Sequence, residues 1–183
     1  MGIYEPAEDS YLMSRILKER IPNILQLNPE LKFLEIGAGS GIHLETVFSL
    51  GIKKENIFSC DIDKVAVSHC DVLGFNCVHS DLFQNIKGKY DLIIFNPPYL
   101  PRDKREPKDS QLATTGGKRG DEIILRFLEQ AKNYLNKNGI IFLITSSLSP
   151  NIKFDKLGYK EKEVGCEVLF FEKLCIWELK LVN

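Results

Sequence analysis

The ten residues at positions 32–41 read Lys-Phe-Leu-Glu-Ile-Gly-Ala-Gly-Ser-Gly and decide the fold. Residues 32–36 predict a short strand, and a helix is expected to follow the glycines up to about residue 50. Such a glycine turn lets a ligand approach the backbone closely and offers it the free N–H groups of the helix N-terminus. The spacing is G-x-G-x-G rather than the G-x-G-x-x-G of dinucleotide folds, which disfavours a dehydrogenase.

An acidic residue stands at the end of three successive predicted strands. Glu35 lies just before the first glycine, where a strand with no special role would prefer an apolar residue. Asp61 lies roughly 20 residues beyond the glycine turn, where an acid commonly accepts hydrogen bonds from ribose hydroxyls. The alternative role for Asp61 is to cap the helix predicted at residues 64–73. With Asp81, which follows the third strand, these acids indicate a ligand site at one edge of the sheet.

The stretch Asn96-Pro97-Pro98-Tyr99 follows an apolar run that predicts a buried fourth strand. The two prolines lack N–H donors, so the strand must end there. The residue before a proline is held extended, which keeps Asn96 at the carboxyl end of that strand. An ordinary strand-ending turn uses the same residue types and is the alternative.

The hydrophobic pattern along the chain predicts an α/β fold with a mostly parallel sheet and a C-terminal antiparallel hairpin. The first helix is expected to begin at residues 6–10 and to end at Pro22. Residues 100–120 form a long connection with three glycines, which suits a lid over a site, although a solvated connection is the alternative. The seven predicted strands span residues 32–36, 56–60, 76–79, 90–95, 140–144, 159–168 and 173–181.

The composition places limits on the class of protein. The chain has 183 residues, which suits a single domain over residues 1–183, and a formal net charge of −1, which argues against nucleic-acid binding through bulk electrostatics. The start resembles no signal peptide and no apolar run could cross a bilayer, so we expect a cytoplasmic protein with no membrane partner.

The cysteines and histidines predict no metal site. Because the number of cysteines is odd and none form C-x-x-C, we expect reduced core thiols and no structural zinc. The histidines are scattered along the chain, and we expect none of them to have a special role. The residues concerned are Cys60, Cys70, Cys77, Cys166, Cys175, His43, His69 and His79.

These motifs together resemble the class I, Rossmann-like, S-adenosylmethionine-dependent methyltransferases. The resemblance rests on residues 35–41, on Asp61 and on the N-P-P-Y stretch, which is similar to that of enzymes that methylate adenine amino groups or glutamine amides. The stretch Tyr-Glu-Pro-Ala-Glu-Asp-Ser at residues 4–10 is similar to the start of the eukaryotic and archaeal HemK-related enzymes. Those methylate the glutamine of the Gly-Gly-Gln loop in class 1 translation termination (peptide chain release) factors.

The resemblance implies a seven-stranded sheet with helices on both faces and a set of site residues. S-adenosyl-L-methionine, and its product S-adenosyl-L-homocysteine, would contact Tyr4, Ser10, Glu35, Gly37, Gly39, Asp61, Asp81, Leu82 and Asn96. The glutamine would contact Asn96, Pro97, Pro98 and Tyr99, of which Asn96, Pro97 and Tyr99 would take part in catalysis. The side-chain oxygen of Asn96 and the carbonyl of Pro97 can each accept one amide N–H, and Tyr99 can stack on the flat amide. No metal is implied.

The resemblance also implies a protein partner besides the release factor. The related enzymes work with a small zinc-binding activator. Residues 76–79 are expected to form a strand at the edge of the sheet, and the activator could extend the sheet by pairing a strand of its own with them. That edge is expected to expose Phe75, Cys77 and Val78. Two alternatives remain open: an adenine methyltransferase acting on DNA or RNA, and a non-catalytic cofactor-binding subunit.

Overall fold

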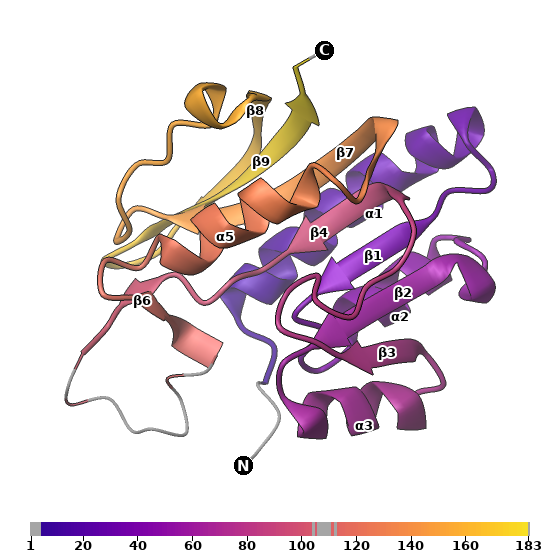
Figure 1. Ribbon diagram of the computed structural model, residues 1–183, viewed down its shortest axis with the longest axis horizontal. Coiled ribbons are helices and arrows are strands. Elements are labelled where there is room, and N and C mark those ends of the chain that lie inside the picture. Colours follow the sequence, from indigo (N-terminus) through magenta and orange to yellow (C-terminus); the bar gives the residue numbers. More distant parts are fainter. Residues whose placement is uncertain (1–4, 104, 106–110, 112, 183) are drawn as a thin grey trace.

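A computed structural model describes residues 5–103, 105, 111 and 113–182 of the chain. Its centre is a twisted seven-stranded sheet in the order β3-β2-β1-β4-β7-β9-β8 (Figure 1). β9 runs antiparallel to β7 and to β8, and the other pairs are parallel, so the predicted sheet and hairpin are confirmed. The strands are β1 (Phe33–Ile36), β2 (Ile57–Asp61), β3 (Asn76–His79), β4 (Tyr90–Phe95), β7 (Leu135–Ser146), β8 (Tyr159–Val168) and β9 (Lys173–Leu181).

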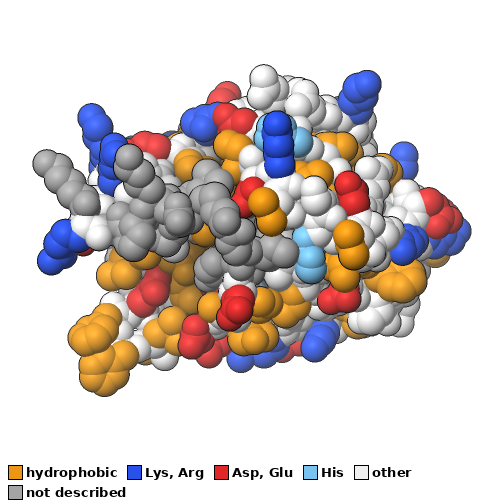
Figure 2. Space-filling view, turned by 90° about the horizontal axis from the view of Figure 1, so that it is seen from below, with side chains coloured by type: hydrophobic (Ala, Val, Ile, Leu, Met, Phe, Trp, Pro, Cys, Tyr) orange, Lys and Arg blue, Asp and Glu red, His pale blue; other side chains and the backbone are white. Residues whose placement is uncertain are grey.

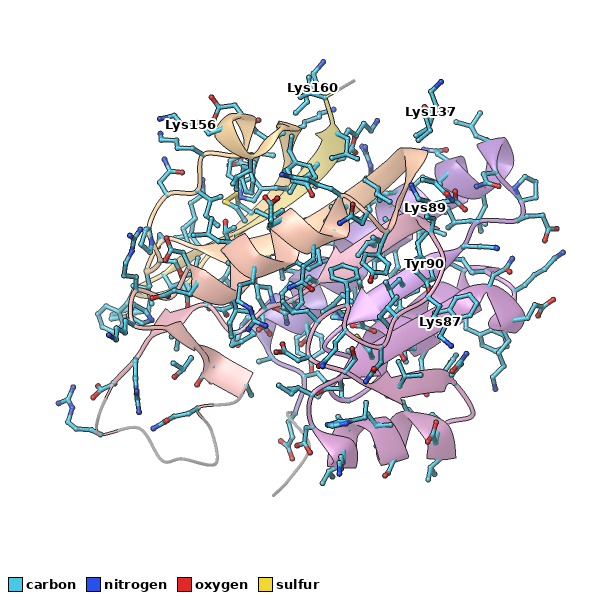
Figure 3. All side chains as sticks on the ribbon, in the orientation of Figure 1. Lys87, Lys89, Tyr90, Lys137, Lys156 and Lys160 are labelled. Carbon is cyan, nitrogen blue, oxygen red and sulfur yellow. A yellow bond between two sulfur atoms is a disulfide. The ribbon has the colours of Figure 1, made fainter. Side chains whose placement is uncertain are left out.

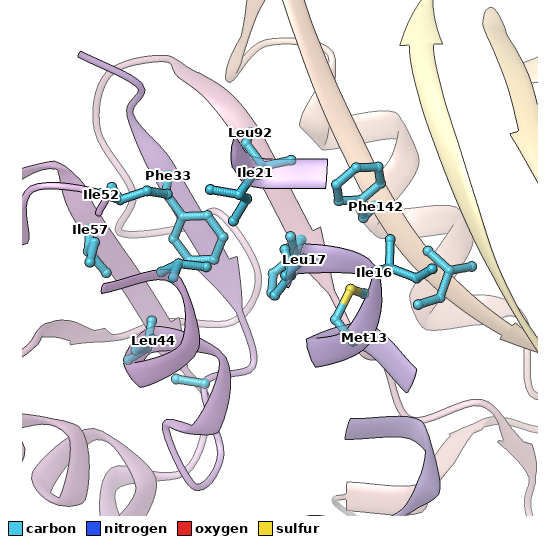
Figure 4. Close-up of a cluster of buried hydrophobic side chains, with 14 of the residues drawn as sticks. Met13, Ile16, Leu17, Ile21, Phe33, Leu44, Ile52, Ile57, Leu92 and Phe142 are labelled. Carbon is cyan, nitrogen blue, oxygen red and sulfur yellow. The ribbon is translucent and has the colours of Figure 1, made fainter. Parts of the chain in front are cut away.

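Helices cover both faces of the sheet and bury two hydrophobic clusters. The helices α1 and α2 supply apolar side chains to the cluster on one face of the sheet, and Figure 4 shows this cluster. The helix α5 supplies apolar side chains to the cluster on the other face. The helical segments are α1 (Glu8–Leu27), α2 (Ile42–Ser49), η1 (Lys54–Asn56), α3 (Lys64–Val72), α5 (Glu122–Ala131) and η2 (Asp155–Leu157). Among the described residues, no helix has both the length and the apolar character needed to cross a membrane.

The strand register brings the predicted motifs to one edge of the sheet. Ile36 at the end of β1 pairs with Cys60 of β2 on one side and with Phe95 of β4 on the other. The glycine turn after β1, Asp61 at the end of β2 and Asn96 after β4 therefore lie next to one another. This is the carboxyl edge, where open parallel sheets bind ligands.

The first helix does not end at Pro22, as the sequence pattern predicted, but continues through it to Leu27. A proline inside a helix removes one backbone hydrogen bond and crowds the preceding turn. Here the residues beyond it, Ile24 and Leu25, pack against the core cluster of α1 and the sheet. This burial offsets the local cost and keeps the chain helical.

The prediction that all five cysteines are reduced is wrong for two of them. Cys166 of β8 and Cys175 of β9 form a disulfide, because the antiparallel register places them directly opposite each other with their Cα atoms 4.2 Å apart. The other three cysteines, Cys60, Cys70 and Cys77, are buried and free, as expected.

The long connection after the N-P-P-Y stretch contains a small parallel sheet of β5 (Leu100–Pro101) and β6 (Thr115–Gly117). A Cβ atom on Gly116 would lie 2.6 Å from the carbonyl oxygen of Pro98, and one on Gly120 would lie 2.5 Å from that of Tyr99. Only glycine therefore fits at these two places, where the connection packs against the backbone of the motif. A lid role for residues 100–120 stays a prediction, and part of that connection lies outside the described residues.

A buried pair of titratable side chains joins three elements beneath the glycine turn. Nδ1 of His43 in α2 lies 2.6 Å from Oε1 of Glu35 in β1, and Nε2 of the same ring lies 3.1 Å from the backbone oxygen of Ser10 in α1. A carbonyl oxygen only accepts hydrogen bonds, so Nε2 carries a hydrogen. The expectation that His43 has no special role is therefore wrong.

The two pKa values show how this pair shares its charge. Burial raises the pKa of Glu35, and His43 opposes part of that rise. Burial alone would lower the pKa of His43, but the charge and hydrogen bond of Glu35, with the bond to Ser10, outweigh it and raise that pKa. Each raised pKa favours the protonated form of its group, so the two side chains share a proton across the 2.6 Å contact between Nδ1 of His43 and Oε1 of Glu35.

We expect His43→Ala to lower the free energy of unfolding by about 3–5 kcal/mol at pH 8, because it leaves the carboxylate of Glu35 buried without a cation. A group whose pKa is raised on folding favours the folded state at pH values below its unfolded pKa, and this contribution is lost as the pH rises through the folded pKa. In the variant the raised pKa of Glu35 has no histidine to oppose it, so protonation of Glu35 at low pH should make the deficit relative to the wild type smaller at pH 5 than at pH 8. Denaturant unfolding at the two pH values measures this.

The matched control is His69→Ala, which removes a partly exposed histidine from α3 and should cost far less at both pH values. A deficit for His43→Ala that is small, or that does not change with pH, would contradict the proposed charge sharing.

Candidate active site

A pocket of about 490 Å³ opens at the carboxyl edge of the sheet. This volume suits a ligand of cofactor size. The predicted site residues that line it are Ser10, Glu35, Gly37, Gly39, Asp61, Asp81, Leu82, Asn96, Pro97 and Pro98. Residues that lie far apart in the sequence thus come together in one pocket. Tyr4, a predicted cofactor contact, lies outside the described residues.

The glycine turn forms the floor between β1 and β2. Gly37 and Gly41 have φ angles of +72° and +77°, which side-chain-bearing residues rarely adopt. The backbone N–H groups of Gly37 and Ala38 donate to the carbonyl of Cys60 at 2.8 and 3.1 Å. These bonds fix the turn against β2 and leave its outer surface open to the pocket.

Asp61 holds the glycine turn in place from the end of β2. Its Oδ2 accepts a hydrogen bond from the N–H of Gly39 at 2.9 Å, and its Oδ1 accepts one from the N–H of Asp63 at 2.8 Å. Burial raises the pKa of Asp61, while these backbone bonds favour the carboxylate. The helix-cap alternative is wrong, because Asp63 is the residue that caps α3, through the N–H of Val65.

The residues after β3 make the neighbouring wall. Leu82 has a φ of +50°, the one positive φ among the described residues other than glycine. Its carbonyl accepts hydrogen bonds from the hydroxyl of Ser80 at 2.9 Å and the thiol of Cys60 at 3.3 Å, which hold this strained conformation. Asp81 projects beside it and pairs with Arg126 of α5 at 2.8 Å.

Asn96 carries an unused acceptor. Its Oδ1 is buried and has no hydrogen-bond partner among the described residues. A buried oxygen in this state costs about 1–3 kcal/mol, so a protein gains by providing it with a donor from a ligand. Pro97 and Pro98 line the pocket beside it. The arrangement suits a ligand that carries N–H groups.

Tyr99 points elsewhere. It does not line the pocket, and its hydroxyl reaches Oδ2 of Asp9 at 3.4 Å. Its backbone oxygen accepts a short hydrogen bond from the hydroxyl of Ser149. The stacking of Tyr99 on a flat amide and a catalytic part for Tyr99 both stay predictions.

The pocket has a strongly acidic lining. Oε2 of Glu35 is buried without a partner in the described part of the chain, and its other oxygen bonds His43. One of the two basic lining residues, Arg126, is paired with Asp81 and the other, His43, with Glu35. The acidic residues that line the pocket are Asp9, Glu35, Asp61, Asp63 and Asp81. Such a lining favours a ligand with positive charge.

Sequence reasoning missed the contributions of His43, Ile123 and Arg126 to the pocket. His43 lies eight residues beyond Glu35, and only the reversal of the chain at the glycine turn brings them together. Ile123 and Arg126 are three apart on α5, which places them on one face, but nothing in the pattern says that this face meets the pocket.

Comparisons with known proteins agree with this geometry. A sequence model of the family described as Eco57I restriction-modification methylase matches residues 71–157. A Methanocaldococcus jannaschii protein, provisionally named protein N5-glutamine methyltransferase, is 37% identical over 191 positions that cover 97% of this chain and 92% of that protein. The methyltransferase HEMK2 of Mus musculus is 31% identical over 155 positions, which cover 78% and 71% of the two chains.

The fold has a counterpart among solved structures. The structure of the E. cuniculi Mtq2–Trm112 complex, described as responsible for methylating the eRF1 translation termination factor, matches with a TM-score of 0.72 and 24% identity over 100% of both chains. At that identity the match supports the fold alone, while the two sequence relatives support the family. The chain belongs to the HemK-related N5-glutamine methyltransferases of the HEMK2 type, within the class I S-adenosylmethionine-dependent methyltransferases.

Proposed function

We propose that this chain transfers a methyl group from S-adenosyl-L-methionine to the side-chain amide of the glutamine in the Gly-Gly-Gln motif of a class 1 release factor. The observation that carries the proposal is the buried, unpartnered Oδ1 of Asn96 in an acidic pocket beside a glycine turn. The naming of two relatives as glutamine methyltransferase and HEMK2, and of the Mtq2 complex as acting on eRF1, supports the same acceptor.

The residues present fit the cofactor. S-adenosyl-L-methionine carries a sulfonium and an ammonium group, which suit the acidic lining, and Oε2 of Glu35 is an acceptor without a partner in the described chain. We assign Glu35, Gly37 and Ser10 to its methionine end. Asp61 and Gly39 lie where ribose hydroxyls would be bound, and Asp81 and Leu82 lie where the adenine would be flanked. When bound, the cofactor supplies the methyl group.

The chain's own residues would position the nitrogen. An amide nitrogen is a poor nucleophile, because its lone pair is delocalised into the carbonyl group. Acceptance of its two hydrogens by Oδ1 of Asn96 and the carbonyl of Pro97 would draw the nitrogen toward sp³ geometry and favour the positive charge that develops on it. Precise positioning can supply roughly 7–11 kcal/mol in favourable cases. The extra proton can leave after the transfer, so no strong base is needed.

The acidic lining of the pocket favours a protein acceptor over a nucleic acid. The pocket wall is acidic, which opposes a phosphate backbone. The lysines labelled in Figure 3 precede β4, begin β7 or lie beside the start of β8, so they stand at the amino edge of the sheet, opposite the pocket. They are Lys87, Lys89, Lys137, Lys156 and Lys160.

We further propose that a small zinc-binding activator adds a strand along β3. The topology puts β3 at one edge of the sheet, where β2 is its one paired neighbour among the described strands. The expectation that Phe75 and Cys77 are exposed there is wrong, because both pack into the core cluster and are 6% and 7% exposed. Val78 is partly buried, so the backbone of β3, rather than an apolar surface, would attract the partner.

The acceptor is tested by incubating the chain, with and without a purified activator, with labelled cofactor and a purified class 1 release factor. We expect label in the release factor and none in a form whose Gly-Gly-Gln glutamine is changed to alanine. Plain DNA and RNA should take no label. Label that persists in the alanine form, or that appears in adenine, would contradict the proposed acceptor.

Two single changes should separate binding from transfer. Asp61→Asn removes a charged acceptor and should weaken cofactor binding by about tenfold to a hundredfold, since such bonds contribute about 1.5–3 kcal/mol. Asn96→Ala should leave that affinity within a few-fold and lower kcat by about a hundredfold or more. Calorimetry with the cofactor and single-turnover transfer measure the two effects. Equal activity in Asn96→Ala would remove Asn96 from the mechanism.

The edge proposal is tested with Val78→Lys, which places a charge on β3 and should weaken binding of the activator. The control is Val72→Lys, since Val72 is 85% exposed on the neighbouring helix α3. Pull-down with the purified activator and melting of each variant give the two readouts. If Val78→Lys folds and binds the activator as tightly as Val72→Lys, the partner does not dock along β3.

A further inference from the structure

The turn between β8 and β9 exposes an aromatic pair. Val168, Phe170 and Phe171 are 78%, 91% and 83% exposed. The two phenylalanine rings pack edge to face against each other, with centroids 4.6 Å apart, instead of against the core. Figure 2 shows hydrophobic side chains that project at the left of the molecule, where Figure 1 places this turn. Single exposed apolar residues are common on protein surfaces, whereas several that are exposed together often mark an interaction site.

The turn lies at the same edge of the sheet as the pocket. Ser146, at the carboxyl end of β7, pairs with Leu174 near the start of β9. The N–H of Ser147 donates to the carbonyl of Lys173 at 2.9 Å, and the hydroxyl of Ser149 donates to the carbonyl of Tyr99. A short hydrogen-bonded run thus connects the base of this turn to the motif that contains Asn96.

The turn is also held firmly. The Cys166–Cys175 disulfide joins its two strands close to the tip. The N–H of Leu169 donates to the carbonyl of Glu172 at 2.7 Å and closes the turn. A rigid aromatic pair loses little conformational entropy when a partner covers it, which favours binding.

We propose that residues 168–171 form a docking site for the protein that presents the acceptor glutamine, an inference that rests on the function proposed above. Each aromatic side chain can bury about 150–250 Å², so the three residues offer several hundred Å². A stable interface usually needs about 800 Å² on each partner. The tip alone is thus too small for a permanent dimer and suits a substrate that is also held at the pocket and leaves after each transfer.

The neighbouring charges argue against a lipid bilayer as the occupant. Glu167 and Glu172 stand on either side of the tip. The nearby cations are already paired, Arg15 with Glu167 at 3.5 Å and Lys173 with Glu163 at 3.7 Å. Because both cations are held in ion pairs, they do little to attract anionic lipid headgroups. These surroundings suit a protein surface with an apolar depression next to basic groups.

The test compares the Phe170→Ser/Phe171→Ser double variant with a Leu27→Ser/Val72→Ser control, whose side chains are 90% and 85% exposed elsewhere on the molecule. Steady-state methylation of an intact class 1 release factor is measured for both. We expect the tip variant to raise KM for the release factor at least tenfold with kcat, cofactor affinity and melting temperature unchanged. The control should leave KM within twofold.

An unchanged KM in the tip variant, while the wild type methylates the factor, would overturn this docking site and leave the proposed function standing. No transfer by the wild type, even with the purified activator present, would overturn both. The proposal would also be overturned if the wild type sediments as a dimer and the tip variant as a monomer. It would likewise be overturned if the wild type binds phosphatidylserine vesicles and the tip variant does not.

Discussion

The parallel pairing of β1 with β4 is the constraint on which the site depends. It places Ile36 beside Phe95, so the glycine turn and Asn96 begin at the same level of the sheet. A shift of one residue in this register would turn the side chains of β4 to the opposite face. The two hydrophobic clusters prevent that shift, because consecutive residues of β4, such as Leu92 and Ile93, belong to different clusters.

The site built on this pairing combines satisfied and unsatisfied polar groups. Asp61 and His43 use their hydrogen bonds to hold the glycine turn and the first helix. Oε2 of Glu35 and Oδ1 of Asn96 have no partner in the described chain. Buried oxygens of this kind are unfavourable in the free protein, and a ligand with ammonium and amide N–H groups relieves them. Under the proposed function, the same pocket would account for both the binding of a cationic cofactor and the place of the acceptor nitrogen.

Sequence patterns were sufficient where local chemistry decides the structure. The prolines after Asn96 stop β4 whatever surrounds them, and the glycines at residues 37–41 need positive φ angles that few other residues adopt. Patterns failed where distant segments decide. The Cys166–Cys175 disulfide depends on a strand register, and Pro22 remains helical because the helix beyond it packs against the core. The role of His43 appears only when the chain reverses at the glycine turn.

The most direct test of the account is a crystal structure with S-adenosyl-L-homocysteine and a peptide or protein that carries the Gly-Gly-Gln motif. We expect the glutamine amide nitrogen to lie within about 3.2 Å of Oδ1 of Asn96, with its second hydrogen directed at the carbonyl of Pro97. We also expect the ribose at Asp61. A glutamine that enters the pocket while Oδ1 of Asn96 bonds only protein groups or the cofactor would contradict this expectation.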